Sequence, residues 1–208
     1  MPGHGSPIVE WGSAGQAFDG SSQGEKSGDL HVVAPFPGGA LVAVIDGLGH
    51  GPEAAAAARA ARRVLANHAS EPVLTLVERC HEDLRRTRGA VMSLASFDAR
   101  NSTITSIAVG NVEVVLLRAD AAANPPRETI TPRGGIVGYQ LPPLRPTVLS
   151  VYRDDTLIMA TDGIRAGFTT GVVRMRRPQD IAASILADHG TGTDDALVLV
   201  VRYRGASC

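Results

Sequence analysis

The sequence predicts a layered α+β sandwich, in which helices cover sheets of mostly antiparallel strands. Three observations lead to this prediction. Short apolar or alternating segments recur along the chain with turn residues between them, which is typical of strands joined by hairpins. The two longest helical segments are neighbours in the sequence and do not alternate with strands, which disfavours a βαβ fold. The length of 208 residues suits one domain, or at most two small ones, with a core that needs no disulfide.

Nine segments are expected to form strands, because each is an apolar run or an alternation of apolar and polar residues. The expected strands span residues 8–11, 30–36, 40–46, 90–97, 102–109, 112–118, 148–152, 156–161 and 196–203. The third of them reads ALVAVID and is apolar up to its final acid. Tight hairpin turns are expected at residues 98–101 and 110–111.

Helices are expected in three places. Residues 53–68 are rich in alanine and follow Pro52, which suits the first helical position. Residues 71–86 carry apolar side chains three or four positions apart, which forms one apolar stripe. A short helix is expected over residues 181–189. Residues 120–146 are rich in Ala, Pro and Gly and are expected to form a loop region with one short strand.

Composition excludes several classes of protein. A formal net charge of -1 gives no global attraction to nucleic acid or to an anionic membrane, so neither is expected as a partner. Two cysteines, Cys80 and Cys208, do not make a secreted disulfide framework. The longest apolar stretch, residues 40–45, is too short to cross a bilayer, and no signal peptide is visible. A cytoplasmic location is therefore expected.

Acidic residues stand at the ends of three predicted strands. Asp46 closes the run ALVAVID, Asp162 closes LIMATD, and Asp194 and Asp195 precede ALVLVV. Carboxylates that converge at one edge repel each other unless cations lie between them, and carboxylate oxygens suit Mg or Mn. Any one aspartate taken alone is more simply explained as a turn or helix cap. The residues alone therefore leave the choice between an acidic metal cluster and separate turns open.

The order of the motifs resembles a known family. The strings DGLGHGPEAA (46–55), ATDG (160–163) and GTDDALVLV (192–200) are similar to the three metal motifs of PPM-class, or type 2C, protein phosphatases. The glycine pattern of the first string and the segment SGD (27–29) resemble the bacterial branch that includes SpoIIE. Two further strings, ERCHEDLRRTRGA (78–90) and SIAVGNVEVVL (106–116), resemble a small stressosome phosphatase of that branch.

The resemblance implies an architecture. It covers nearly the whole chain from residue 26 to residue 201. It implies a four-layer α-β-β-α sandwich of two antiparallel sheets flanked by helices, with helices 53–68 and 71–86 on one outer face. Residues 1–25 are then expected to be an N-terminal segment with a first strand and a polar loop, and residues 26–204 a phosphatase domain.

The resemblance also implies roles for the acids. Asp46 would bridge two divalent cations, Mn or Mg, and the carbonyl of Gly47 would bind the first. Asp162 and Asp194 would hold the second cation, and Asp29 would orient water near the first. With Asp46, Asp162 and Asp194 as catalytic residues, the attacking group is a water activated between the cations, and no covalent intermediate is needed. Asp195 is expected to lie outside the ligand set.

Several positions depart from the family pattern. Asn111 and Ala166 stand where many relatives carry acids for a third metal, which implies a two-metal site. The phosphate-binding arginine upstream of SGD has no match, and Lys26 is the nearest cation in the sequence. Leu48 replaces a histidine proposed as a general acid, and His50 is nearby, although a solvent-facing place at the helix start is its simpler explanation. Lys26 and His50 are thus weak candidates for binding substrate.

The expected activity is that of a serine/threonine protein phosphatase. By resemblance, the substrates would be phosphorylated STAS-domain proteins of a stressosome-type complex. Two alternatives remain: a catalytically silent module of the same fold that only binds a partner, and a phosphatase that acts on another phosphoprotein or on a small molecule. The basic residues Arg165, Arg174, Arg176 and Arg177 are expected either to face an acidic or phosphorylated partner or to form a solvated loop.

Overall fold

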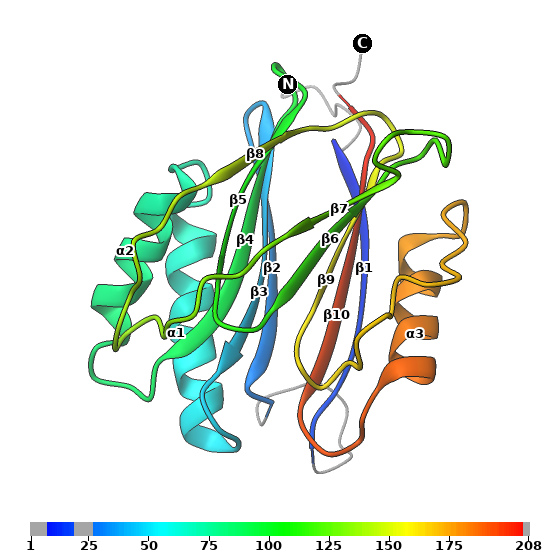
Figure 1. The fold of residues 1–208 in the computed structure, drawn as a ribbon. Helices are drawn as coiled ribbons and strands as arrows, with labels where there is room; N and C mark the ends of the chain where they lie inside the picture. Colours follow the sequence, from blue (N-terminus) through cyan, green and yellow to red (C-terminus); the bar gives the residue numbers. More distant parts are fainter. Residues whose placement is uncertain (1–7, 19–26, 206–208) are drawn as a thin grey trace, which may run out of the picture.

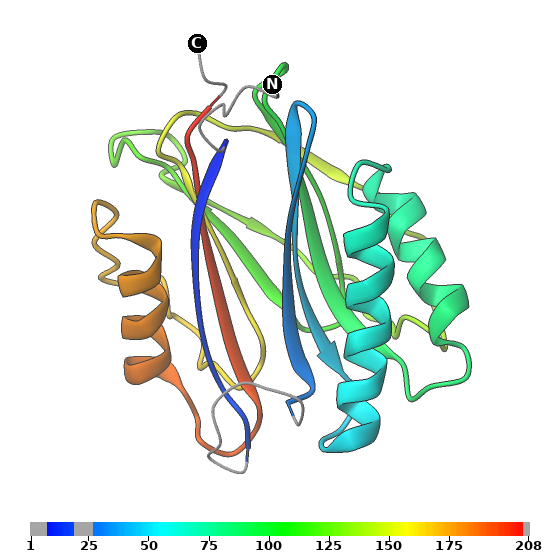
Figure 2. The ribbon, with the colours of Figure 1, turned by 180° about the vertical axis from the view of Figure 1, so that it is seen from behind.

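Two antiparallel sheets stack face to face between helices, as the views from the front and from behind show (Figures 1 and 2). The structure is a computed structural model, and it describes residues 8–18 and 27–205. Each sheet has five strands, and every pairing between neighbouring strands is antiparallel. The predicted α-β-β-α sandwich is therefore confirmed.

One sheet has the strand order β2-β3-β4-β5-β8. Its strands are β2 (Asp29–Phe36), β3 (Gly39–Gly47), β4 (Ala90–Asp98), β5 (Thr103–Val109) and β8 (Thr147–Ser150). The interior strand β3 is buried along nearly its whole length, which explains why its sequence is a continuous apolar run and does not alternate. Tight turns join β2 to β3 and β4 to β5, so this half of the sandwich is largely a meander.

The other sheet has the strand order β1-β10-β9-β6-β7. Its strands are β1 (Val9–Gln16), β10 (Ala196–Tyr203), β9 (Thr156–Ala160), β6 (Glu113–Leu117) and β7 (Arg127–Ile130). The strand β7 is the one expected within the loop region 120–146. The first strand of the chain thus pairs with the last, and the division of the chain at residue 26 stays a prediction.

Helices cover both outer faces of the sandwich (Figure 1). Helices α1 (Pro52–Asn67) and α2 (Val73–Leu84) pack together on the sheet that contains β3, as predicted. Helix α3 (Pro178–His189) packs on β1 and β10 of the other sheet. It begins three residues before the predicted helix, at a proline that suits the first turn. In the described part of the chain, no helix is long and apolar enough to cross a membrane.

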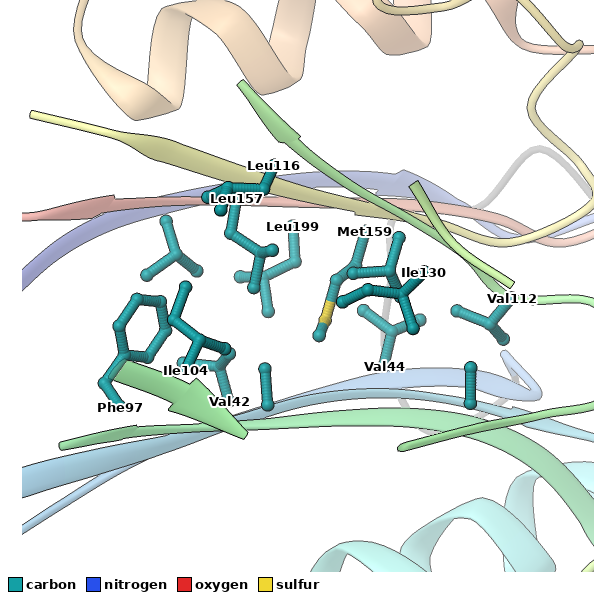
Figure 3. Close-up of a cluster of buried hydrophobic side chains, with 14 of the residues drawn as sticks. Val42, Val44, Phe97, Ile104, Val112, Leu116, Ile130, Leu157, Met159 and Leu199 are labelled. Atoms are coloured by element: carbon teal, nitrogen blue, oxygen red, sulfur yellow. The ribbon is translucent and has the colours of Figure 1, made fainter. Parts of the chain in front are cut away.

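Three apolar layers hold the sandwich together. The central layer lies between the sheets, where side chains such as Val42, Leu157 and Leu199 interdigitate (Figure 3). A second layer joins α1 and α2 to the sheet of β3, and a third joins α3 to the sheet of β10. Burial of apolar surface stabilises the folded state by about 25 cal/mol per Å² of surface removed from water. These layers therefore hold the two sheets in a fixed position relative to each other. They thereby fix the strand ends that carry the acids.

Candidate functional site

The predicted acids lie near the end of β3, the beginning of β2, the end of β9 and the beginning of β10. These strand ends are at the end of the sandwich opposite the described chain termini (Figure 1). In the antiparallel pair of β2 and β3, Asp29 lies directly opposite Asp46. Asp162 comes two residues after β9, and Asp194 comes two residues before β10, which pairs with β9. β3 ends where β2 and β10 begin, so the register brings acids from both sheets to the same end.

A threonine links the two sheets at this end. The hydroxyl of Thr161 donates a hydrogen bond of 2.7 Å to Oδ2 of Asp29. The same hydroxyl accepts a hydrogen bond of 2.9 Å from the backbone N–H of Leu197. Asp29 is only 1% exposed, so this bond satisfies a buried carboxylate across the two layers. Sequence reasoning did not assign a role to Thr161, although the residue is part of the ATDG string.

The two adjacent aspartates before β10 have different surroundings. Asp195 is buried, and its two oxygens accept hydrogen bonds from the backbone N–H groups of Phe18 at 2.7 Å and Gly28 at 2.6 Å. Asp194 is exposed. Asp195 therefore ties the segments after β1 and before β2 to β10, while the side chain of Asp194 lies at the surface of the acidic end.

Two glycines allow the close approach of neighbouring segments. A Cβ atom on Gly47 would lie 2.1 Å from the carbonyl oxygen of Ala54, in the first turn of α1. A Cβ atom on Gly163 would lie 2.1 Å from the carbonyl oxygen of Asp195. Both distances are far shorter than van der Waals contact, so the glycine after each acid is required for α1 and the start of β10 to approach so closely.

The carboxylates repel one another. Burial, followed by the charges of Asp162, Asp194 and Asp195, raises the pKa of Asp46 to about 7. Burial, followed by the charge of Asp46, raises the pKa of Asp29 well above its ordinary value. Burial and the charge of Asp194 also raise the pKa of Asp162. The site thus concentrates negative charge that a bound cation would compensate.

The donor set fits a hydrated cation better than one enclosed by protein. Within residues 8–18 and 27–205, no three His, Cys, Asp or Glu side chains are close enough to hold a metal ion by themselves. Asp162 accepts a hydrogen bond of 2.7 Å from the side-chain amide of Asn111, and Asp194 accepts one of 2.8 Å from the N–H of Asp195. These bonds turn both carboxylates toward protein donors. Mg keeps several waters and needs only one or two carboxylates, so the oxygen donors present suit Mg or Mn.

The weaker candidates have separate outcomes. His50 is exposed just before α1, and its ring centroid lies 6.2 Å from that of Phe18, a residue that the sequence did not single out. Leu48 is half-buried and packs against the central apolar layer, which explains an apolar residue at this position. Ala166 is exposed. Lys26 lies outside the described residues.

Most arginines of the basic loop bind within the protein. Arg165 donates to the carbonyl oxygens of Gly190 and Asp188, and Arg176 donates to the hydroxyl of Ser184. Arg177 forms an ion pair with Asp180 of α3, three residues further along the chain. These three side chains are thus tied to α3 and the segment after it.

Comparison with solved structures defines the class of the fold. A crystal structure of RsbX in complex with magnesium superposes on this chain with a TM-score of 0.81 and 20% sequence identity. The match covers 98% of this chain and 98% of the RsbX chain. The PP2C phosphatase domain of SpoIIE from Bacillus subtilis covers 96% of this chain and 64% of its own, with a TM-score of 0.73 and 20% identity. The fold is therefore that of the PP2C phosphatases.

Sequence comparison defines the family. Residues 37–204 match the family model described as Stage II sporulation protein E (SpoIIE), so the chain belongs to the SpoIIE family. The phosphoserine phosphatase RsbX of Bacillus subtilis (strain 168) is 29% identical over 109 residues, which make up 52% of this chain and 51% of RsbX. The match thus spans about half the length of that curated relative.

A further solved structure is similar to this chain over most of its length. It comes from work on the bacterial stressosome as a modular system adapted to control secondary messenger signalling. It is 31% identical, covers 93% of this chain and 99% of its own, and has a TM-score of 0.83.

Proposed function

We propose that this protein is a metal-dependent serine/threonine protein phosphatase. The observation that carries the proposal is the convergence of Asp29, Asp46, Asp162 and Asp194 at one end of the sandwich, where burial and neighbouring carboxylate charges raise the pKa values of the first three. Two divalent cations, when bound, would lower the pKa of a water and neutralise phosphate oxygens. This end of a PP2C-type fold in a SpoIIE-family chain is where such chemistry is expected.

The residues would divide the work as follows. Asp46 would contact both cations, because it lies near the end of β3 and is repelled by the charges of three other acids. The carbonyl of Gly47 would bind the first cation, and Asp162 and Asp194 would bind the second. Asp29, buried and fixed by the hydroxyl of Thr161, would orient the attacking water. Direct attack by water needs no serine or cysteine nucleophile.

The proposed substrates are phosphorylated STAS-domain proteins of a stressosome-type complex. Two comparisons support this choice: one relative is named phosphoserine phosphatase RsbX, and one similar structure comes from work on the stressosome. The reaction would hydrolyse a phosphoserine or phosphothreonine ester and release inorganic phosphate. A cytoplasmic location stays a prediction.

The direct test is release of inorganic phosphate from a phosphorylated STAS-domain protein in the presence of Mn or Mg. We expect turnover that EDTA abolishes and that Mn restores. Hydrolysis of p-nitrophenyl phosphate separates loss of chemistry from a wrong choice of protein substrate. Absence of metal-dependent hydrolysis of both substrates by a folded, Mn-loaded protein would indicate the alternative, a silent binding module.

A further inference from the structure

A cation stands beside the glycine-rich loop that follows Asp46. The pairing of β3 with β4 continues one step beyond the strands, because the N–H of Leu48 donates to the carbonyl of Gly89 at 3.1 Å. The next residues outward on the two segments are Gly49 and Arg88. A Cβ atom on Gly49 would lie 3.0 Å from Nη1 of Arg88, so the guanidinium group lies directly against this loop, three residues from Asp46.

The segment that carries Arg88 is fixed at both sides. The hydroxyl of Thr87 donates to the carbonyl of Leu84 at 2.8 Å and accepts from the N–H of Gly89 at 3.0 Å. Gly89 has a φ of +81°, and a Cβ atom there would lie 2.7 Å from the carbonyl oxygen of Val137. Only glycine fits this position, and the backbone of Arg88 is therefore held in a defined place between two anchored residues.

The guanidinium group is also oriented. Its Nε forms an ion pair with Glu53 in the first turn of α1. That contact occupies one edge of the guanidinium, while Nη1 faces Gly49. The side chains of Arg88 and Glu53 are 53% and 67% exposed, and an ion pair with that exposure contributes little to stability. A stabilising role therefore does not account for this arrangement.

The chemistry of the proposed substrate gives the arrangement a use. A phosphate monoester brings negative charge to an end of the molecule that already holds Asp29, Asp46, Asp162 and Asp194. The planar fork of an arginine matches phosphate oxygens and forms charge-assisted hydrogen bonds with them. The segment that carries SGD offers no such fork, because the first arginine of the chain is Arg59.

We propose that Arg88 binds the phosphate group of the substrate through its Nη atoms, and that Glu53 is the residue that positions it. This inference rests on the proposed phosphatase function and adds a phosphate-binding residue to it. The loop between α2 and β4 then supplies a group that the motifs of the acidic cluster do not contain.

The chain offers a matched control. Arg85, three residues before Arg88, forms an exposed ion pair of 3.0 Å with Glu82, and its side chain is 59% exposed. Arg85→Ala thus removes the same charge and a similar ion pair from the same segment. Arg85 has no contact with the loop after Asp46 among the described contacts, so its loss tests nonspecific effects of charge.

The experiment compares Arg88→Ala, Arg88→Lys and Arg85→Ala with the wild type, using p-nitrophenyl phosphate as substrate and inorganic phosphate as inhibitor. For Arg88→Ala we expect the KM and the inhibition constant of phosphate to rise about tenfold, with kcat changed about twofold or less. Arg88→Lys should fall between, because lysine keeps the charge and loses the fork. Glu53→Ala should raise KM about threefold. Arg85→Ala should match the wild type.

A binding measurement supports the kinetics without turnover. Inorganic phosphate should raise the Tm of the Mg-loaded wild type and of Arg85→Ala, and should raise that of Arg88→Ala much less. Equal KM values and equal phosphate effects in Arg88→Ala and Arg85→Ala would overturn the inference while leaving the phosphatase function intact. An inactive wild type would overturn the proposed function instead, and the Tm shifts would still decide whether Arg88 binds phosphate.

Discussion

Asp194 and Asp195 are neighbours in the sequence, yet the structure gives them different work. Both oxygens of Asp195 accept backbone hydrogen bonds in a buried place, whereas Asp194 is exposed at the acidic end. The strand-end pattern located both residues but did not distinguish them, because the distinction depends on Phe18 and Gly28, far away in the sequence. Only the family resemblance favoured Asp194 as the ligand.

This difference predicts opposite effects of two alanine substitutions. Asp195→Ala leaves the buried N–H of Gly28 and the part-buried N–H of Phe18 without acceptors and should lower the free energy of unfolding by about 1–3 kcal/mol. Asp194→Ala should leave stability in EDTA unchanged or slightly higher, because it removes a repelling charge, and should reduce phosphatase activity severely. Urea unfolding in EDTA and phosphate release provide the two measurements. An Asp195→Ala protein as stable as the wild type would contradict this assignment.

His31 on β2 provides a residue-scale prediction about pH. Burial, and then the charge of Arg62, lowers the pKa of His31, whose ring centroid lies 5.4 Å from that of Trp11 on β1. The folded protein therefore binds fewer protons at this group than the unfolded chain does. The contribution of His31 to the free energy of unfolding is therefore fully present above its unfolded pKa of about 6.5. It is lost as the pH falls through the lower pKa of the folded protein.

Trp11 is the only tryptophan of the chain, so its fluorescence reports on His31 directly. We expect a fluorescence change with a midpoint below pH 6.5, because a charged imidazole quenches indole more strongly than a neutral one. His31→Gln should remove the fluorescence change and also the loss of stability that His31 contributes as the pH falls below about 6.5. A midpoint above 6.5 would show that the charged form is favoured and that the sign is wrong.

At the scale of elements, the sequence patterns predicted most helices and strands. Where an element differs from its prediction, contacts with distant segments account for the difference. The helices over 52–67 and 73–84 follow from alanine content and apolar spacing within the segments themselves. Strand β1 extends to Gln16, beyond the predicted range 8–11. The residues Gly12, Ser13 and Gly15 do not favour a strand by themselves, but pairing with β10 holds them in one. This pairing joins the two ends of the described chain, so it cannot be predicted from the local sequence around β1.

Gly12 shows why a weak strand former is present in β1. A Cβ atom there would lie 2.3 Å from the backbone of Gln179, in the first turn of α3. Gly12→Ala should therefore push α3 away from β1 and cost about 1–3 kcal/mol of stability, as overpacking usually does. Gly134→Ala is the control, because a Cβ atom at that position has no neighbour within 4 Å. Chemical denaturation of both variants decides the point, and equal stabilities would refute the close packing of α3.

At the scale of the whole molecule, the layered fold and the end that carries the acids were predictable, while the bonds across the layers were not. Strand-end placement and the order of the motifs brought Asp46, Asp162 and Asp194 to one region. The Thr161–Asp29 hydrogen bond joins residues 132 positions apart in different sheets, and no sequence pattern specifies it. The same holds for Arg88, whose place against Gly49 depends on the pairing of β3 with β4.

Stability and metal binding should be opposed in this molecule, and Asp46→Ala tests the opposition. Burial and repulsion raise the pKa of Asp46 to about 7, so its charged form costs folding energy at neutral pH without metal. The variant should therefore have an unchanged or slightly higher Tm in EDTA and no phosphatase activity. Mn at about 100 times its Kd should stabilise the wild type by about 2.7 kcal/mol through one site, and the variant much less. Glu78→Ala removes an exposed carboxylate of α2 and should respond to Mn as the wild type does. If Asp46 were only a turn residue before Gly47, its loss would lower the Tm in EDTA and leave Mn-dependent turnover in place.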